Sequence, residues 1–166
     1  MAETISNNEW HRIVMTCIIY DGKGRFLVTK RAPGKKVHPD KWTVPGGGLE
    51  PDDYLKTKKT TKDAWYFVVE RTLRREVKEE VNLEIEKPKY LVDIVFIRPD
   101  NVPVLVLSYF AKYKSGKVKL EEGDATEFKW MTVKEGRKLD FISGILEEIE
   151  YVDQILKGNN NPTLKF

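Results

Sequence analysis

Three glutamates within five residues are the part of this sequence best suited to chemistry. In a helix, Glu76, Glu79 and Glu80 would fall within an arc of about 100°, because each residue turns the chain by ~100°. Carboxylates at this spacing repel one another, and the helix dipole disfavours negative charge near a carboxyl-terminal end. Divalent cations such as Mg²⁺ or Mn²⁺ prefer oxygen ligands and would relieve the repulsion. Taken alone, the cluster also fits a solvated, salt-bridged helix face.

A run of glycines upstream, Pro45-Gly46-Gly47-Gly48, is the second unusual segment. Glycine has low propensity for both helix and strand, so we expect an irregular backbone at this run. Lys30 and Arg31 end a predicted strand. Their charges suit contacts with substrate phosphates, or equally an ordinary rim position.

Together these residues resemble the signature of the Nudix hydrolase family, G-x5-E-x7-R-E-U-x-E-E-x-G-U, where U is a bulky aliphatic residue. Gly47 matches the opening glycine, and the second half is matched by Arg75, Glu76, Val77, Glu79, Glu80 and Leu83. The preceding Trp42-Thr43-Val44-Pro45 matches the Trp-x-x-Pro lead that is common in the family. The layout looks most like that of the compact, MutT-like members.

The match departs from the family signature at three points. Asp53 stands for the first glutamate of the signature, and Asn82 stands for its closing glycine. The largest departure is an insertion of 14 residues between Asp53 and Arg75. Glu70 is the other acid to consider for the first position, but it lies only five residues before Arg75. We prefer Asp53, and expect a bulge at residues 54–63 and a helix that is lengthened at its front.

The resemblance implies divalent-metal-dependent hydrolysis of a phosphoanhydride bond in a nucleoside diphosphate linked to another group, with a nucleoside triphosphate as the favoured substrate. It implies Mg²⁺ or Mn²⁺ as cofactor, held by Glu76, Glu79, Glu80 and a main-chain carbonyl at Gly47. By the same analogy, Arg75 would orient the glutamates by bridging Asp53 and Glu79. The resemblance therefore assigns the glutamates to the metal and makes Arg75 a positioning residue.

The base that deprotonates the attacking water is left open among Glu79, Glu80 and Glu122. Glu122 precedes the closing strand much as in MutT-type members, although an ordinary loop carboxylate explains it equally well. Substrate contacts are expected from Lys30, Arg31, Gly46 and Gly47.

Other functions stay open at this point. Within the family these are hydrolysis of nucleotide sugars or dinucleoside polyphosphates, and a non-catalytic Nudix-fold binding module. A basic RNA-associated domain is a further alternative. All three metal carboxylates are present, which favours an enzyme over a binding module.

The insertion itself is strongly basic, with lysines at 56, 58, 59 and 62. Such a loop could clamp a polyphosphate or a nucleic-acid 5′ end, but lysine-rich loops are more commonly just solvated. Trp65, Tyr66 and Phe67 could stack on a base. Three adjacent aromatic residues point around a helix, so packing in the core or between subunits is the preferred interpretation.

The elements that must position these residues form a single domain, residues 1–166. β-Branched and aromatic segments predict strands at 12–20, 25–31, 42–44, 89–98, 102–114 and 127–133. Helical spacing of apolar residues predicts helices at 63–81, where Leu73 and Val77 face the core, and at 140–157. We expect an α/β fold, a Nudix-like α/β/α sandwich with a mixed β-sheet between helices.

Composition and charge limit the class of protein. The chain has 166 residues and a net charge of +3, which suits anionic small molecules and is too weak to indicate duplex nucleic acid. The sole cysteine, Cys17, excludes an intrachain disulfide. Residues 1–10 are polar, and no apolar run approaches the ~20 residues of a membrane span. We expect a cytoplasmic protein with a small-molecule nucleotide partner, no membrane association and nucleic acid disfavoured, and the sequence leaves a homodimer open.

Overall fold

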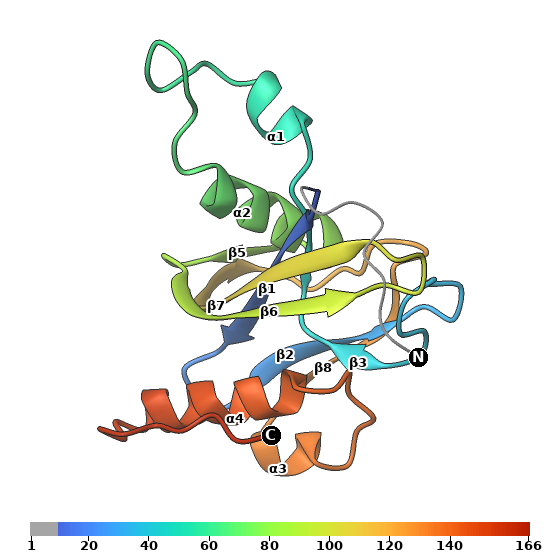
Figure 1. Ribbon diagram of the computed structural model, residues 1–166. Coiled ribbons are helices and arrows are strands. Elements are labelled where there is room, and N and C mark those ends of the chain that lie inside the picture. Colours follow the sequence, from blue (N-terminus) through green and yellow to red (C-terminus); the bar gives the residue numbers. More distant parts are fainter. Residues whose placement is uncertain (1–9) are drawn as a thin grey trace.

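A mixed β-sheet between helices forms the centre of the computed structural model, which describes residues 10–166 (Figure 1). The expectation about the polar segment 1–10 therefore lies outside the described residues, apart from Trp10. Helix α2 covers one face of the sheet, and α3 and α4 cover the other, so the predicted α/β/α sandwich is confirmed. The elements in chain order are β1 (Arg12–Tyr20), β2 (Phe26–Arg31), β3 (Trp42–Thr43), β4 (Gly46–Gly48), α1 (Asp52–Leu55), α2 (Val68–Val81), β5 (Leu83–Ile85), β6 (Lys89–Ile97), β7 (Pro103–Gly116), β8 (Ala125–Met131), α3 (Val133–Gly136) and α4 (Ile145–Leu156).

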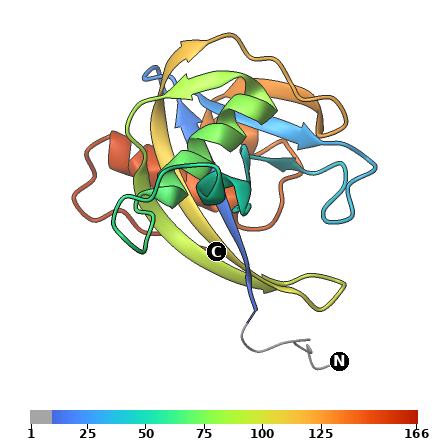
Figure 2. The same cartoon turned by 90° about the horizontal axis from the view of Figure 1, so that it is seen from above.

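The sheet is mixed because its two central strands run parallel. β1 pairs with β7 along its whole length, from Arg12 opposite Val104 to Tyr20 opposite Lys112. The first predicted hairpin exists, but β1 and β2 pair only next to their turn, since β2 then pairs with β3 and β8. The second hairpin, β6 with β7, is confirmed. Viewed from above, α2 crosses over these strands (Figure 2).

Alternating side chains of β1 supply two separate core layers. Met15, Cys17 and Ile19 pack under α2, whereas Ile18 belongs to the layer under α4. Leu73 and Val77 of α2 are fully buried, as their helical spacing predicts. Burial also raises the pKa of the Cys17 thiol to about 12. This cysteine is therefore a small buried hydrophobic residue.

Both long helices begin later than the sequence predicts. Helix α2 starts at Val68 instead of residue 63, because Phe67 adopts a left-handed conformation with φ of 59°. Residues 60–66 form their own hydrogen bonds instead of extending the helix. Helix α4 starts at Ile145 instead of residue 140, after Gly144 with φ of 93°. The predicted end of α2 is confirmed, since Asn82 caps it in the left-handed conformation.

The glycine run is a strand, which corrects the expectation of an irregular backbone. β4 pairs antiparallel with β1, so that Met15 lies opposite Gly47. A Cβ at Gly46 would lie 2.2 Å from the Met15 carbonyl oxygen. Glycine is therefore what permits this pairing, and the contact with β1 outweighs its low strand propensity. The short elements α1, α3 and β5 are also absent from the sequence-based prediction.

The insertion, here called the insertion lobe (residues 54–67), stands beyond the start of α2 and away from the sheet (Figure 1). It contains the end of α1 and a folded-back segment at 60–66, so the insertion protrudes as predicted but extends to residue 67 instead of 63. Tyr66 and Phe67 are 54% and 77% exposed, so the expectation that they pack in the core of this chain is wrong, and packing between subunits stays a prediction. None of the helices among residues 10–166 is both long and apolar enough to cross a bilayer.

A buried carboxylate of helix α4 should make the stability of the protein depend on pH. Glu148 is 3% exposed and accepts a hydrogen bond from the Ser108 hydroxyl. Burial raises its pKa above the ordinary value of 4.5. Folding therefore favours the protonated acid, and the free energy of unfolding should fall as pH rises through the folded-state pKa.

We expect Glu148→Gln to stabilise the protein well above pH 4.5, because the amide oxygen still accepts the Ser108 hydrogen bond without carrying a charge. Below pH 4.5 the two proteins should unfold alike. Urea unfolding at several pH values measures the difference, with exposed Glu84→Gln as control. A Glu148→Gln protein that is less stable than the wild type at neutral pH would show that the carboxylate is favourable there.

Candidate active site

Two of the three signature glutamates face the glycine strand. The Gly46 N–H donates a hydrogen bond to Glu80 Oε2 at 2.9 Å. A Cβ built on Gly47 would lie 2.2 Å from the carboxylate of Glu76. Helix α2 and strand β4 thus place Glu76 and Glu80, one helical turn apart, against Gly46 and Gly47.

Arg75, in helix α2, contacts Asp53, which precedes the insertion, and two of the signature glutamates. Its Nε and Nη2 donate to the two oxygens of Asp53 at 2.6 and 3.0 Å, and its Nη1 donates to Glu79 at 2.8 Å. The same Nη1 lies 2.8 Å from Glu76 Oε1, and Nη2 donates to the Gly48 carbonyl at 3.2 Å. The structure therefore gives Arg75 the predicted contacts with Asp53 and Glu79. Glu70, the alternative acid, pairs with Arg74 instead.

The environment of Asp53 favours its charged form. Arg75 lowers the pKa of this carboxyl to about 2, assisted by hydrogen bonds from the Glu50 N–H and the Thr72 hydroxyl. In the folded protein its pKa therefore lies below the ordinary 3.8. The stabilisation is present above pH 3.8 and is lost as pH falls through 2.

We expect Asp53→Asn to lower the free energy of unfolding by roughly 1.5–3 kcal/mol, because it removes charge-assisted hydrogen bonds to Arg75. The stability of the variant should also depend less on pH between 4 and 2. Chemical unfolding of both proteins over that range measures the effect. Asp52→Asn, which breaks only an exposed pair with Lys56, is the matched control. If both variants lost the same free energy of unfolding, the hydrogen bonds of Asp53 to Arg75 would not contribute more than an exposed ion pair.

Burial and nearby negative charges make ionisation of the Glu80 carboxyl unfavourable. Burial raises its pKa well above 4.5, and the nearby carboxylates of Asp124 and Glu76 raise it further. The Gly46 N–H only partly opposes these effects. Burial also raises the pKa of Glu76, although Arg75 opposes this. Glu79 differs, since its side chain is 51% exposed and paired with Arg75.

Asp124 is a site residue that the sequence analysis missed. It precedes β8, interacts with Glu80 and forms an ion pair with Lys35. Its backbone carbonyl accepts a hydrogen bond from the Ala32 N–H, which fixes this loop beside the end of β2. Glu122, the predicted base from the same loop, is exposed and makes no hydrogen bond or ion pair with any described residue. No short sequence pattern links Asp124 to the signature.

The two predicted phosphate-binding cations are already engaged by protein groups. Lys30 forms a 3.1 Å ion pair with Glu127 across strands β2 and β8. Arg31 donates from Nε to the Val37 carbonyl at 3.0 Å. No described contact joins either residue to the signature glutamates. A substrate phosphate would therefore have to compete with these partners.

The donor set suits a hard divalent cation. Glu76, Glu79, Glu80 and Asp124 offer oxygen ligands, and the buried Glu80 has like charges close by. Within residues 10–166, no three carboxylate, histidine or cysteine side chains are already gathered closely enough to form a metal site. Arg75 contacts one oxygen of Glu76 and one of Glu79. The residues present fit the metal by their chemistry.

A surface hollow of about 470 Å³ lies apart from these residues. It is lined by the turn after β1, the end of β7 and part of β8, including Lys23, Tyr113 and Trp130. Leu83, the last aliphatic residue of the signature, lines it, but none of the signature glutamates does, so the hollow does not alter the assignment of the candidate site.

The sequence model of the NUDIX domain matches residues 10–147, and the chain belongs to this family. Among curated relatives, nucleoside triphosphatase NudI of Enterobacter sp. (strain 638) is 31% identical over 72 residues, which are 43% of this chain and 41% of that protein. NudI of Escherichia coli (strain K12) is 28% identical over 71 residues, 43% of this chain and 40% of that protein. The match thus spans less than half the length of these curated relatives.

Solved structures share the fold at low sequence identity. The MutT protein from Methanosarcina mazei Go1 has a TM-score of 0.66 at 19% identity, over 94% of this chain and 100% of that chain. The NUDIX domain of Shewanella oneidensis NrtR, complexed with ADP ribose, has a TM-score of 0.68 at 14% identity, over 89% of this chain and 89% of that chain. A C. elegans Ap4A hydrolase has a TM-score of 0.63 at 21% identity, over 89% of this chain and 98% of that chain. These likenesses establish the architecture.

Proposed function

We propose that this chain hydrolyses a phosphoanhydride bond in a nucleoside diphosphate-linked substrate, with Mg²⁺ or Mn²⁺ as cofactor. The observation that carries the proposal is the convergence of Glu76 and Glu80 on the Gly46–Gly48 strand, with Asp124 beside them. Buried carboxylates this close together are costly unless a cation neutralises them.

Each residue at the site has a distinct role in this proposal. Glu76, Glu79, Glu80 and the main chain at Gly47 hold the metal, which when bound neutralises phosphate charge and acidifies water. Arg75 is a positioning residue, since it fixes Glu76 and Glu79 while it is itself held by Asp53. Main-chain groups of Gly46 and Gly47 could contact a substrate phosphate, and Lys30 and Arg31 lie at the end of β2, from which they could also contact it.

The water-activating base is one of a small set of carboxylates. Glu79, Glu80 and Glu122 are the predicted choices, and Asp124 joins them because it interacts with Glu80. The burial of Glu80 suits a metal ligand or a base with a raised pKa, whereas the exposure of Glu122 suits a base that acts only when substrate is bound.

The first substrates to test are nucleoside triphosphates, since two curated relatives are named nucleoside triphosphatases. ADP-ribose, a nucleotide sugar and a dinucleoside tetraphosphate are the second group, because two structural neighbours are titled for ligands of this kind. Chromatography of the products, in ¹⁸O-labelled water, identifies the bond broken and the phosphorus attacked. We expect turnover that requires Mg²⁺ or Mn²⁺ and stops with a chelator. Failure to cleave any of these compounds with either metal would contradict the proposal.

A further inference from the structure

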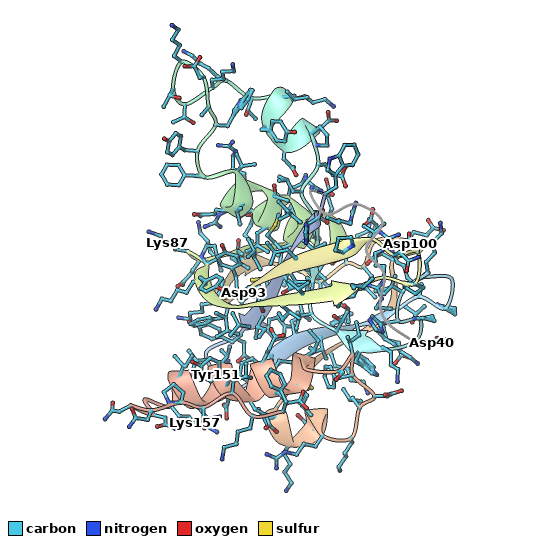
Figure 3. The ribbon with its side chains drawn as sticks, in the orientation of Figure 1. Asp40, Lys87, Asp93, Asp100, Tyr151 and Lys157 are labelled. Atoms are coloured by element: carbon cyan, nitrogen blue, oxygen red, sulfur yellow. The ribbon has the colours of Figure 1, made fainter. Side chains whose placement is uncertain are left out.

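The insertion lobe has an ordered structure of its own. The Thr60 and Thr61 N–H groups donate to the Ala64 carbonyl at 3.0 and 3.1 Å, so the chain reverses direction at this point. The rings of Tyr54 and Trp65 pack with centroids 5.4 Å apart, and Trp65 Nε1 donates to the Thr57 carbonyl at 3.0 Å. The lobe is thus a defined surface, and its side chains stand away from the sheet (Figure 3).

Two aromatic rings at the end of the lobe face solvent. Tyr66 and Phe67 lie with ring centroids 6.4 Å apart, and they are 54% and 77% exposed. Phe67 also has a φ of 59°, which is unfavourable for a bulky residue. The Tyr66 N–H bond to Thr60 Oγ1 and the Arg71 bond to the Tyr66 carbonyl help to hold this conformation. The fold therefore maintains a costly backbone geometry that leaves a phenyl ring in water.

The same lobe carries positive charge without matching acids. Lys58, Lys59 and Lys62 form no ion pair within the described residues, whereas Lys56 pairs with Asp52. Lys59 lies over the Trp65 ring at 5.0 Å, which places its charge on the lobe surface. The only acid between residues 54 and 67 is Asp63. The net charge of +3 for the whole chain therefore hides a local concentration of cations.

We propose that the insertion lobe binds single-stranded nucleic acid, with Tyr66 and Phe67 stacking on bases and Lys58, Lys59 and Lys62 contacting phosphates. Unpaired bases expose flat apolar faces between regularly spaced negative charges, which matches a lobe that carries both solvent-exposed rings and lysines without ion pairs among residues 10–166. A duplex would offer the lysines its phosphates but not the faces of its bases. The surface lies outside the glutamate site, so this inference goes beyond the proposed hydrolysis and does not depend on it.

Fluorescence anisotropy with the full chain tests the proposal. The probe is a 3′-labelled single-stranded RNA of about twelve nucleotides with a 5′-hydroxyl end, which contains no phosphoanhydride bond to hydrolyse. Three lysine contacts predict a slope near −2 for log K against log salt, because each phosphate contact on a single strand contributes about −0.7. A Lys58→Ser/Lys59→Ser/Lys62→Ser variant should lose most of that slope.

Stacking is tested separately from charge. A Tyr66→Ser/Phe67→Asn variant should bind at least tenfold more weakly with an unchanged salt slope, since loss of a stacked base costs about 5- to 150-fold. Asn is chosen at position 67 because it tolerates the left-handed conformation. A Lys134→Ser/Lys138→Ser/Lys157→Ser control removes the same charge from α3 and from the residues that follow α3 and α4. Both helices lie on the opposite side of the sheet from the lobe (Figure 1). The control variant should bind RNA almost as the wild type does.

Three results would overturn the proposal. They are no RNA binding by the wild type at low salt, equal weakening by the lobe and control variants, and binding to phosphatidylserine vesicles without binding to RNA. The lobe variants should hydrolyse mononucleotide substrates as the wild type does. RNA binding therefore fails or succeeds independently of the proposed hydrolysis.

Discussion

Glu80→Gln is expected to reduce kcat by about 10³-fold or more, the scale on which groups that act directly in catalysis contribute. Glu80 is the buried carboxylate that accepts a hydrogen bond from the Gly46 N–H and lies beside Glu76 and Asp124. A glutamine keeps the shape and still accepts that hydrogen bond, but it removes the charge that a cation requires. Steady-state kinetics at saturating Mg²⁺ measures the loss.

The folded state of Glu80→Gln should be at least as stable as that of the wild type. Burial and like charges raise the pKa of Glu80, so the neutral side chain removes an unfavourable ionisation. Thermal unfolding in a chelator provides this comparison. Glu84→Gln, on the exposed side of β5, is the control for an equal change of charge and should retain full activity. Retention of wild-type kcat by Glu80→Gln would remove Glu80 from the site.

The second large effect is expected from alanine substitution at two adjacent glycines, where one substitution should lower activity and the other should lower stability. A Cβ at Gly47 would lie 2.2 Å from Glu76, which is the end of a flexible side chain that can move aside. We expect Gly47→Ala to fold but to lose about 10²-fold in activity, as displacement of a catalytic group by about 1 Å can do. A Cβ at Gly46 would instead lie 2.2 Å from the Met15 backbone oxygen, which cannot yield without breaking the pairing of β1 and β4.

Gly46→Ala should therefore lower stability strongly, whereas Gly47→Ala should mainly lower turnover. Circular dichroism with thermal unfolding, together with kinetics, separates the two effects. Gly34→Ala is a suitable control, because a Cβ there meets nothing within 4 Å. A fully active Gly47→Ala protein would show that activity does not depend on the present position of the Glu76 carboxylate.

The grouping of the signature glutamates could be predicted from the sequence because it depends on short-range helical spacing. The turn of α2 sets the relation of Glu76 to Glu80, whereas the contact of Arg75 with Asp53 spans 22 positions and was implied only by the resemblance to the Nudix signature. The α/β/α architecture followed in the same way from apolar periodicity in β1, α2 and α4.

Features that depend on tertiary contacts could not be predicted in this way. The strand character of Gly46–Gly48 comes from pairing with β1, which intrinsic propensity ignores. The late start of α2 depends on hydrogen bonds of Thr60, and the position of Asp124 beside Glu80 depends on the loop before β8. Helix α3 is different, because its Thr132–Glu135 capping box is a sequence signal that could have predicted the start of this helix.

A titration of the metal-free protein with Mn²⁺, followed by the electron paramagnetic resonance signal of free Mn²⁺, tests the central claim most directly. We expect saturable Mn²⁺ binding by the wild type and by Glu84→Gln, and an affinity for Mn²⁺ at least tenfold lower in Glu76→Gln and Glu80→Gln. Equal binding by all four proteins, or none by the wild type, would contradict a cation site at these glutamates.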